Sequence, residues 1–388
     1  MKERWEYSKI GKLCKTYSGG TPLKNVKEYY QNGNIPWLRS GEVCKKYISE
    51  TEMFITQKGL ENSSAKYYPI DTVVVAMYGA TAAQVGILKI EATSNQAVCG
   101  ILPNRKFLPE FLYYFFCYRK EFLASQAQGG AQPNISQVKI KNLDVPVPPL
   151  SEQQTIVDYL DSAFAKIDAM KANAEKALNE AKALFQASLK EMLEPKEGWE
   201  EKTIGELFKT YAGGTPLKSG KEYYEGGKIP WIRSGEVCKM YIKDCEMYIT
   251  EDGMKNSSAK YYPINTVLVA MYGATAAQVG ILKFEATSNQ AVCGILPHKD
   301  FIPEFVYYWF SNIQKDLAAQ AQGGAQPNLS QVKIKKVLIS YPPLSEQQSI
   351  VATLDSLKSK VDRLKANYDK ISQECDALKQ AILRQVFE

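Results

Sequence analysis

Two stretches of about 40 residues carry apolar side chains at alternating spacings of three and four. In residues 151–194 these positions are Ile156, Leu160, Ala163, Ile167, Met170, Ala174, Ala177, Ala181 and Leu184, and in residues 345–388 they are Ile350, Leu354, Leu357, Val361, Leu364, Tyr368, Ile371, Cys375, Leu378 and Ile382. A heptad pattern of this length predicts two long coiled-coil helices. A proline pair precedes each stretch, and Ser151 with Gln154, repeated as Ser345 with Gln348, predicts a capping box at each start.

A helix with so long an apolar seam needs a partner, and the nearest candidate is the other stretch. The first seam is narrow and rich in alanine, whereas the second carries larger side chains, so the two can pack small against large. We therefore expect the two helices to pair within the chain. The alternative is that each helix docks separately on its own neighbouring module.

The segments before these helices show mixed patterns. Short runs rich in β-branched residues predict buried strands at 72–77 and 97–102, and helical spacing predicts a helix at 111–122. Turn signals stand at 19–22, at 32–34 and at Gly129-Gly130. Each segment therefore reads as a mixed α/β module.

The chain repeats itself after 194 residues. Segment 62–103 matches segment 256–297 at 39 of 42 positions, and the string Gly-Gly-Thr-Pro at 19–22 returns at 213–216. We therefore predict an α/β (α+β) protein with tandem-duplicated modules at 1–150 and 195–344. Helices at 151–194 and 345–388 would form an antiparallel coiled coil, which would make the protein pseudo-two-fold symmetric.

Composition and charge narrow the class of protein. Of 388 residues, 45% are hydrophobic and 23% are charged, as in ordinary globular proteins. The net charge of +6 is uneven, because residues 1–150 carry +7 and residues 195–344 carry +2, which is compatible with a polyanionic partner. Because no apolar run is long enough to span a bilayer and residues 1–10 lack a signal-peptide pattern, we expect a cytoplasmic protein with no membrane partner.

Several common chemistries have no signal in the sequence. The eight cysteines form no Cys-x-x-Cys pair and His298 is the single histidine, so we expect no metal site and mostly buried, reduced thiols. The phosphate-binding pattern GxxxxGK[ST] and the dinucleotide pattern GxGxxG are missing, as is the Asp/Asn-Pro-Pro-aromatic string of amino-methyltransferases. We therefore predict no catalytic residues and no cofactor.

Two near-identical modules joined by a paired rod suit a ligand with two equivalent sites. Double-stranded DNA offers half-sites about 34 Å apart on one face. If the helices pair antiparallel, both modules would read the same short sequence on opposite strands, which predicts an inverted-repeat (palindromic) target. The alternative is a non-catalytic scaffold that recruits protein partners through its helices without reading sequence.

Candidate DNA contacts are long polar or aromatic side chains in loop-like settings of both modules. Arginine can form a bidentate contact with guanine, glutamine and asparagine with adenine, and lysine, threonine or tyrosine can contact phosphates or stack. The alternative for each is an ordinary surface or loop-capping role. The candidates in the first module are Thr21, Lys24, Arg39, Ser40, Tyr78, Thr81, Gln84, Asn95 and Gln96, and those in the second are Thr215, Lys218, Arg233, Ser234, Tyr272, Thr275, Gln278, Asn289 and Gln290.

The ordered motifs resemble a known family. Each module has Gly-Gly-Thr-Pro, then Ile-Pro-Trp, Gly-Ala-Thr, Asn-Gln-Ala and Gln-Pro-Asn-Ile/Leu-Ser, and ends in Pro-Pro-Leu-Ser-Glu-Gln-Gln before its long helix. This arrangement, over essentially the whole chain, is similar to the specificity (S) subunits of type I restriction–modification systems. The chain departs from the usual pattern because its two modules are nearly the same.

The resemblance implies roles for every part. The modules would be target-recognition domains that each read half of a bipartite DNA site, and the helices would fix the half-site spacing and dock modification (M) subunits, two of them in our expectation. Restriction (R) subunits would complete the complex. S-adenosylmethionine, ATP and Mg²⁺ would be bound by those partners, and the stretch at 82–84 would vary with target, which favours Gln84 as a reader.

Overall fold

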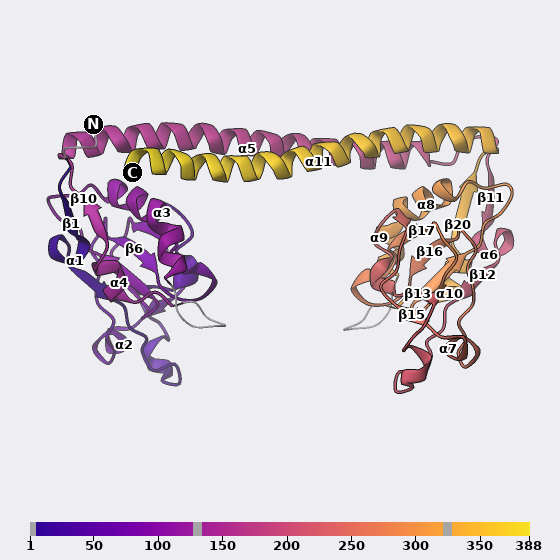
Figure 1. Cartoon of the computed structure of the whole chain (residues 1–388), viewed down its shortest axis with the longest axis horizontal. Coiled ribbons are helices and arrows are strands. Elements are labelled where there is room, and N and C mark those ends of the chain that lie inside the picture. The colour runs from indigo at the N-terminus through magenta and orange to yellow at the C-terminus, as the bar shows by residue number, and fades with distance from the viewer. Residues whose placement is uncertain (1–4, 127–133, 321–327) are drawn as a thin grey trace. The chain divides into compact units, whose positions relative to one another are not determined.

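The computed structural model describes residues 5–126, 134–320 and 328–388. The chain divides into two compact units, Met1–Ala174 with Asp369–Glu388 (unit 1) and Glu175–Tyr368 (unit 2). The predicted turn at Gly129-Gly130 and its counterpart at Gly323-Gly324 lie outside the described residues. Each unit combines one mixed α/β module with parts of the two long helices, α5 (Leu150–Met192) and α11 (Leu344–Phe387) (Figure 1).

The module of unit 1 is built on three small sheets. Their strand orders are β2-β9-β6-β7-β4, β5-β3-β8 and β1-β10. All strand pairs are antiparallel except β4 with β7 and β3 with β8, which are parallel. The elements are β1 (Tyr7–Lys9), α1 (Ile10–Leu13), β2 (Thr16–Ser18), η2 (Lys27–Tyr29), β3 (Ile35–Leu38), η3 (Ser40–Glu42), β4 (Tyr47–Ile48), β5 (Phe54–Ile55), α2 (Gln57–Glu61), β6 (Val73–Ala76), η4 (Gly79–Thr81), β7 (Val85–Leu88), β8 (Thr93–Ser94), β9 (Val98–Ile101), α3 (Pro109–Ser125), α4 (Gln137–Lys141) and β10 (Asp144–Pro146).

The module of unit 2 repeats this topology. Its sheets have the orders β12-β19-β16-β17-β14, β15-β13-β18 and β11-β20. The elements are β11 (Glu200–Thr203), α6 (Ile204–Leu207), β12 (Thr210–Ala212), η5 (Lys221–Tyr223), β13 (Ile229–Ile232), η6 (Ser234–Glu236), β14 (Tyr241–Ile242), β15 (Tyr248–Ile249), α7 (Glu251–Lys255), β16 (Val267–Ala270), η7 (Gly273–Thr275), β17 (Val279–Leu282), β18 (Thr287–Ser288), β19 (Val292–Ile295), α8 (Pro303–Asn312), α9 (Gln314–Ala319), α10 (Gln331–Lys335) and β20 (Leu338–Tyr341).

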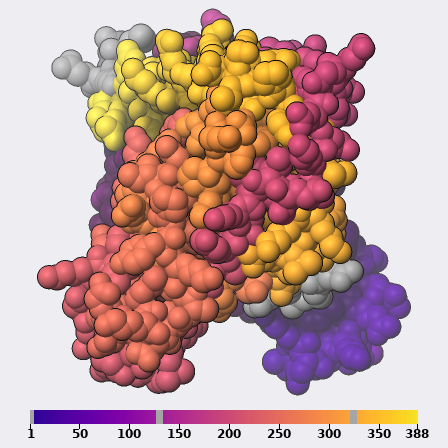
Figure 2. Space-filling model, turned by 90° about the vertical axis from the view of Figure 1, so that its right-hand side faces the viewer, coloured from indigo at the N-terminus to yellow at the C-terminus, as the bar shows by residue number. Residues whose placement is uncertain are grey.

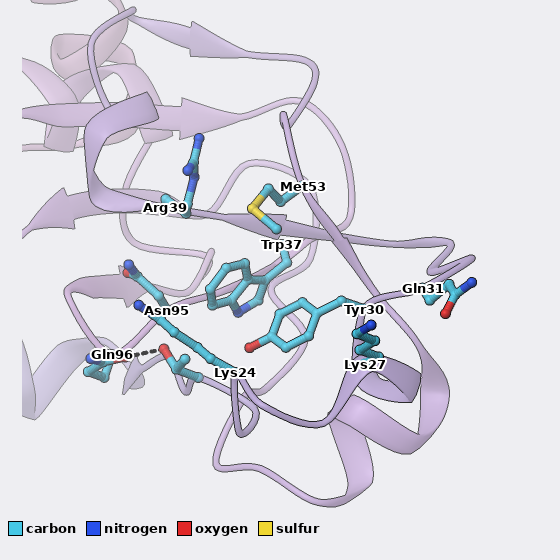
Figure 3. A pocket seen from close by; sticks show the side chains of 10 residues that line it. Lys24, Lys27, Tyr30, Gln31, Trp37, Arg39, Met53, Asn95 and Gln96 are labelled. Carbon is cyan, nitrogen blue, oxygen red and sulfur yellow. Dashed lines mark hydrogen bonds between the residues drawn. The ribbon is translucent and has the colours of Figure 1, made fainter.

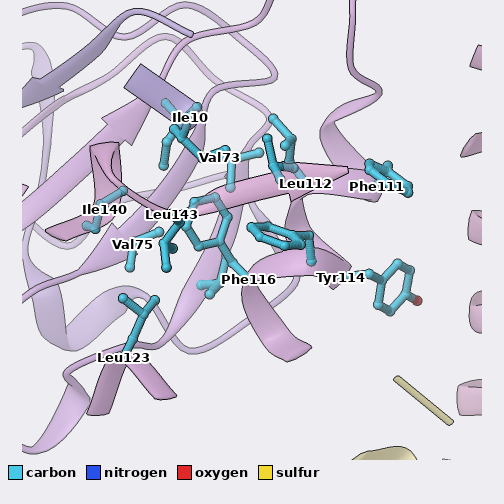
Figure 4. Packing of buried hydrophobic residues seen from close by; sticks show 14 of the residues in the cluster. Ile10, Val73, Val75, Phe111, Leu112, Tyr114, Phe116, Leu123, Ile140 and Leu143 are labelled. Atoms are coloured by element: carbon cyan, nitrogen blue, oxygen red, sulfur yellow. The ribbon is translucent and has the colours of Figure 1, made fainter. Parts of the chain in front are cut away.

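Apolar side chains cover both faces of the central sheet. In β6, Val73 and Val75 join one core cluster while Val74 and Ala76 join another. A strand buried on both faces reads as an unbroken apolar run, which explains why β6 was visible in the sequence. The first cluster lies between the sheet and α3, and Figure 4 shows Phe116 of α3 among the side chains of that cluster. The strands predicted at 72–77 and 97–102 and the helix predicted at 111–122 are confirmed.

The two long helices pair antiparallel in unit 1, where the end of α11 runs along the first half of α5 (Figure 1). Lys379 forms an ion pair with Asp168, and Lys171 Nζ lies 3.5 Å from Asp376 Oδ1. Ile167 and Cys375 are buried beside each other, since the Cys375 thiol contacts the Ile167 carbonyl at 3.8 Å. The pairing expected from the apolar seams is therefore confirmed here.

Both helices also contribute to the module core. In unit 1, Leu160 of α5 and Phe387 of α11 belong to the same buried cluster as the central sheet. In unit 2, Leu189 of α5 and Leu354 of α11 do the same, and the chain around the end of α5 (magenta) lies against the module in Figure 2. Pairing and docking, which the sequence presented as alternatives, therefore occur together.

Two details of the helix prediction are wrong. Helix α5 begins at Leu150, and the Pro149 carbonyl accepts hydrogen bonds from the backbone amides of Glu152 and Gln153. Ser151 therefore lies inside the first turn and does not cap it, and α11 begins at Leu344 in the same way. Several predicted seam positions face solvent instead: Met170 (58% exposed), Ala177, Leu184 (61%), Leu364 (37%) and Leu378 (46%).

Candidate nucleic-acid interface

The segment at 19–24 is held tightly against the sheets of the first module. The Trp37 indole donates a hydrogen bond to the Gly20 carbonyl at 2.9 Å, and the Tyr30 hydroxyl donates to the Pro22 carbonyl at 2.6 Å. A side chain at Gly20 would overlap the backbone of Ala65, so only glycine allows this close approach. These contacts fix the backbone on both sides of Thr21. Lys24, three residues later, is exposed.

This loop forms one wall of a cavity of about 670 Å³ (Figure 3). Five predicted contact residues line the cavity: Thr21, Lys24, Arg39, Asn95 and Gln96. Sequence reasoning missed five others, Lys27, Tyr30, Gln31, Trp37 and Met53, although Trp37 stood in the Ile-Pro-Trp string two residues before Arg39. The cavity combines an aromatic wall with amides and three cations, a set suited to contact base edges and phosphates.

Local hydrogen bonds hold Thr21, Asn95 and Gln96 in place. The Thr21 hydroxyl donates to the Gln96 side-chain carbonyl, which joins two positions 75 residues apart in sequence. The Asn95 side-chain carbonyl accepts from the Ala97 amide at 3.1 Å, and the Asn95 backbone amide donates to the Leu38 carbonyl at 3.0 Å. Each side-chain oxygen accepts one of these bonds, and the NH₂ groups of both amides make no hydrogen bond among the described residues, so they can donate to a ligand.

Arg39 follows β3 and is bonded to two carboxylates. Its Nε lies 3.1 Å from Glu42 Oε1, and its Nη2 forms an ion pair with Glu52. The Arg39 side chain is 42% exposed, and Ser40 beside it begins the short helix η3. Arg39 is therefore held in place at one side of the cavity before any ligand arrives.

The second module repeats these contacts. Thr215 is bonded to Gln290, the Trp231 indole donates to the Gly214 carbonyl at 2.9 Å, and Arg233 is paired with Glu236 and Glu246. Shifted by 194 residues, nine of the ten cavity-lining residues are identical, and the tenth changes from Gln31 to Glu225. Lys218, Ser234 and Asn289 hold the places of Lys24, Ser40 and Asn95.

The remaining candidates lie on a different loop and do not line this cavity. Tyr78 is 36% exposed and forms a β-bridge with Asn134, Thr81 ends η4, and Gln84 precedes β7. Ala83 between them adopts φ +66°, a turn conformation that sets the direction of Gln84. Their counterparts Tyr272, Thr275 and Gln278 occupy the equivalent loop, where the Gln278 side-chain oxygen is buried without a hydrogen-bond partner among the described residues.

The cysteines are free thiols, but only half are buried. Cys14, Cys99, Cys293 and Cys375 are buried, whereas Cys44 and Cys238 are exposed. Burial raises the pKa of both Cys99 and Cys293 to about 12. No cluster of metal-ligating side chains occurs within residues 5–126, 134–320 and 328–388, and none of the helices described there is long and apolar enough to cross a membrane.

Comparisons with known proteins agree with the duplicated architecture. The family model described as type I restriction modification DNA specificity domain matches residues 2–180 and again residues 196–373. The chain is 28% identical over 362 residues to the type I restriction enzyme EcoR124I/EcoR124II specificity subunit of Escherichia coli, covering 90% of this chain and 86% of that protein. It is 26% identical to the MjaIX specificity subunit of Methanocaldococcus jannaschii, covering 92% of this chain and 87% of that one.

Solved structures share the fold. One chain, from a study of the assembly and conformational transition of the type I R-M system, superposes with a TM-score of 0.79 at 20% identity, covering 99% of this chain and 97% of that chain. The HsdS subunit from Thermoanaerobacter tengcongensis superposes with a TM-score of 0.58 at 20% identity, covering 100% of this chain and 97% of that one.

Proposed function

This chain belongs to the type I restriction–modification DNA specificity family, and from that premise we propose that its two modules read the two halves of one DNA site. Its function is DNA sequence recognition within a type I restriction–modification complex. Specificity subunits are not catalytic, because methylation and cleavage belong to the modification and restriction subunits. The scaffold alternative is not favoured, since the relatives are named as specificity subunits.

The target that we propose is an inverted repeat. The observation that carries this proposal is the recurrence of the cavity chemistry, because nine of ten lining residues and the hydrogen bonds of Thr21, Trp37 and Arg39 return in the second module. Two modules that present the same contact side chains recognise the same bases. We propose that the two half-sites have inverted orientation, so that the repeat is read on opposite strands.

The finer organisation is part of the same proposal. Residues 1–150 and 195–344 would be the two target-recognition domains, and residues 151–194 and 345–388 would be the spacer helices that bind partner subunits. DNA and the modification and restriction subunits are the partners of a specificity subunit. We propose two modification subunits, because the combination of one module with parts of the two long helices occurs twice in the chain. We also propose that the complex acts in the cytoplasm.

Mapping of methylated adenines across the host genome tests the target. We expect one motif with two identical half-sites in inverted orientation, interrupted by a fixed spacer. A duplex carrying that motif is then used to measure the affinity of the chain in complex with its modification subunits. Arg39→Ala should lower affinity for this duplex by about 10- to 100-fold relative to a scrambled duplex, as for loss of a bidentate base contact. Two different half-sites, or equal losses on both duplexes, would contradict the proposal.

A further inference from the structure

The two carboxylates beside Arg39 have unequal settings. Glu42 is only 11% exposed, and its oxygens accept from the Arg39 amide at 3.2 Å, from Arg39 Nε and from the Glu52 amide at 3.0 Å. Glu52 is 70% exposed and contacts Arg39 through Nη2. Glu42 is therefore part of the local fold, whereas Glu52 holds the guanidinium from the solvent side.

Counting donors shows what these contacts leave available. A guanidinium has five N–H groups in one plane, and Glu42 and Glu52 use one on Nε and one on Nη2. Among the described residues Nη1 has no hydrogen-bond partner. Nη1 therefore keeps two N–H groups and Nη2 keeps one, and one N–H from each nitrogen can bind O6 and N7 of guanine together.

The same arrangement occurs in the second module. Arg233 Nε lies 3.4 Å from Glu236 Oε1, Arg233 Nη2 pairs with Glu246, and Glu246 is 69% exposed. The backbone amides of Arg233 and Glu246 both donate to Glu236 at 3.0 Å. The contact set is kept although the adjoining residues change from Ser-Glu-Thr at 49–51 to Lys-Asp-Cys at 243–245, so it does not depend on one loop sequence.

We propose that Glu52 and Glu246 are positioning residues that aim the free guanidinium edge of Arg39 and Arg233 at a guanine and prevent these arginines from binding phosphates. This rests on the proposed role of the cavity in reading DNA. Two carboxylates around one guanidinium give this group of three side chains a charge of −1, so Arg39 attracts the phosphates of random DNA less than an unpaired arginine would, and Lys24 and Lys27 of the same cavity remain to contact phosphates. A guanine edge still accepts one N–H from Nη1 and one from Nη2, so the contact discriminates between bases while adding little to general affinity.

The test uses the full chain with its modification subunits and the paired variant Glu52→Gln with Glu246→Gln. The probes are a duplex carrying the genome-mapped motif and a duplex of the same composition with the motif scrambled. We expect the ratio of motif to scrambled affinity to fall about tenfold, with part of the fall coming from tighter binding to the scrambled duplex. The salt dependence on the scrambled duplex should become steeper by about one unit of logarithmic slope per freed arginine.

The matched control is Glu50→Gln with Asp244→Asn, which makes the same charge change in the same loops without a bond to either arginine. It should leave the affinity ratio within about twofold. An unchanged ratio in the Glu52/Glu246 variant, or equal loss on both duplexes, would overturn the positioning role. If Arg39→Ala and Arg233→Ala also leave the ratio unchanged, the reading role of the cavity itself fails, and the two failures are thereby distinguished.

Discussion

Phe387 near the end of α11 is the most informative position for testing how the helix pair supports unit 1. Its ring is 5% exposed and lies 5.5 Å from the Phe111 ring, 5.9 Å from the Phe115 ring and 5.5 Å from the Tyr118 ring. Phe387→Ala removes a buried aromatic side chain, which typically costs about 3–5 kcal/mol. We expect about 3 kcal/mol, because the last turn of a helix can shift to fill part of the space.

Hydrogen exchange measured by mass spectrometry resolves this effect along the chain. A loss of 3 kcal/mol corresponds to roughly 150-fold faster exchange of amides that open with unit 1, so peptides from α3 should exchange faster by about that factor. Peptides from α8 in unit 2 should change by less than about twofold. Leu378→Ala on the same helix is the control, because that side chain is 46% exposed and its loss should cost under about 0.5 kcal/mol. Unchanged exchange in α3, or an equal rise in α8, would refute the assignment of this helix end to the core of unit 1.

Two further predictions concern thiols and the cavity loop. At pH 8, iodoacetamide should modify the exposed thiols of Cys44 and Cys238. Cys99 and Cys293 should stay unmodified, because burial raises the pKa of both thiols to about 12 and keeps them protonated. Peptide mapping measures the labelling, and early labelling of Cys99 in the folded protein would contradict the prediction. Gly20→Ala should lower the melting temperature by several degrees and reduce the affinity for the target duplex, because the added Cβ would overlap the Ala65 backbone. A variant with the melting temperature and affinity of the wild type would show that the loop can move.

The sequence predicted the architecture well because its strongest signals are local or repeated. The 194-residue repeat, the apolar runs of β6 and β9 and the heptad spacing each require only neighbouring positions or self-comparison. After Ile167 the predicted seam is half right: Ala174 and Ala181 are partly buried as expected. Lys171 and Leu178 are less exposed than Met170 and Ala177, the positions that were predicted beside them. Alanine occupies so many positions of α5 that two seams fit its pattern, and the observed one buries the larger side chain of Leu178.

The site was only partly predictable because it depends on contacts between distant segments. Thr21 and Gln96 were candidates as lone polar residues and both line the cavity, but nothing local shows that they bond across 75 positions. Tyr30 was missed because its role follows from its contact with the Pro22 carbonyl. Conversely, Arg39 looked like a free cation in sequence, and its two carboxylate partners became visible only when the chain had folded.

The division of α11 between the two units has a consequence for synthesis. Unit 2 is one continuous stretch, Glu175–Tyr368, and its residues leave the ribosome before Asp369–Glu388. Unit 1 begins to emerge first, yet its buried cluster includes Leu383 and Phe387, so its core stays incomplete until after unit 2 has been translated. Unit 2 can therefore complete its core before unit 1 does. Until Asp369–Glu388 has been translated, the apolar side chains of unit 1 that pack against Leu383 and Phe387 stay uncovered.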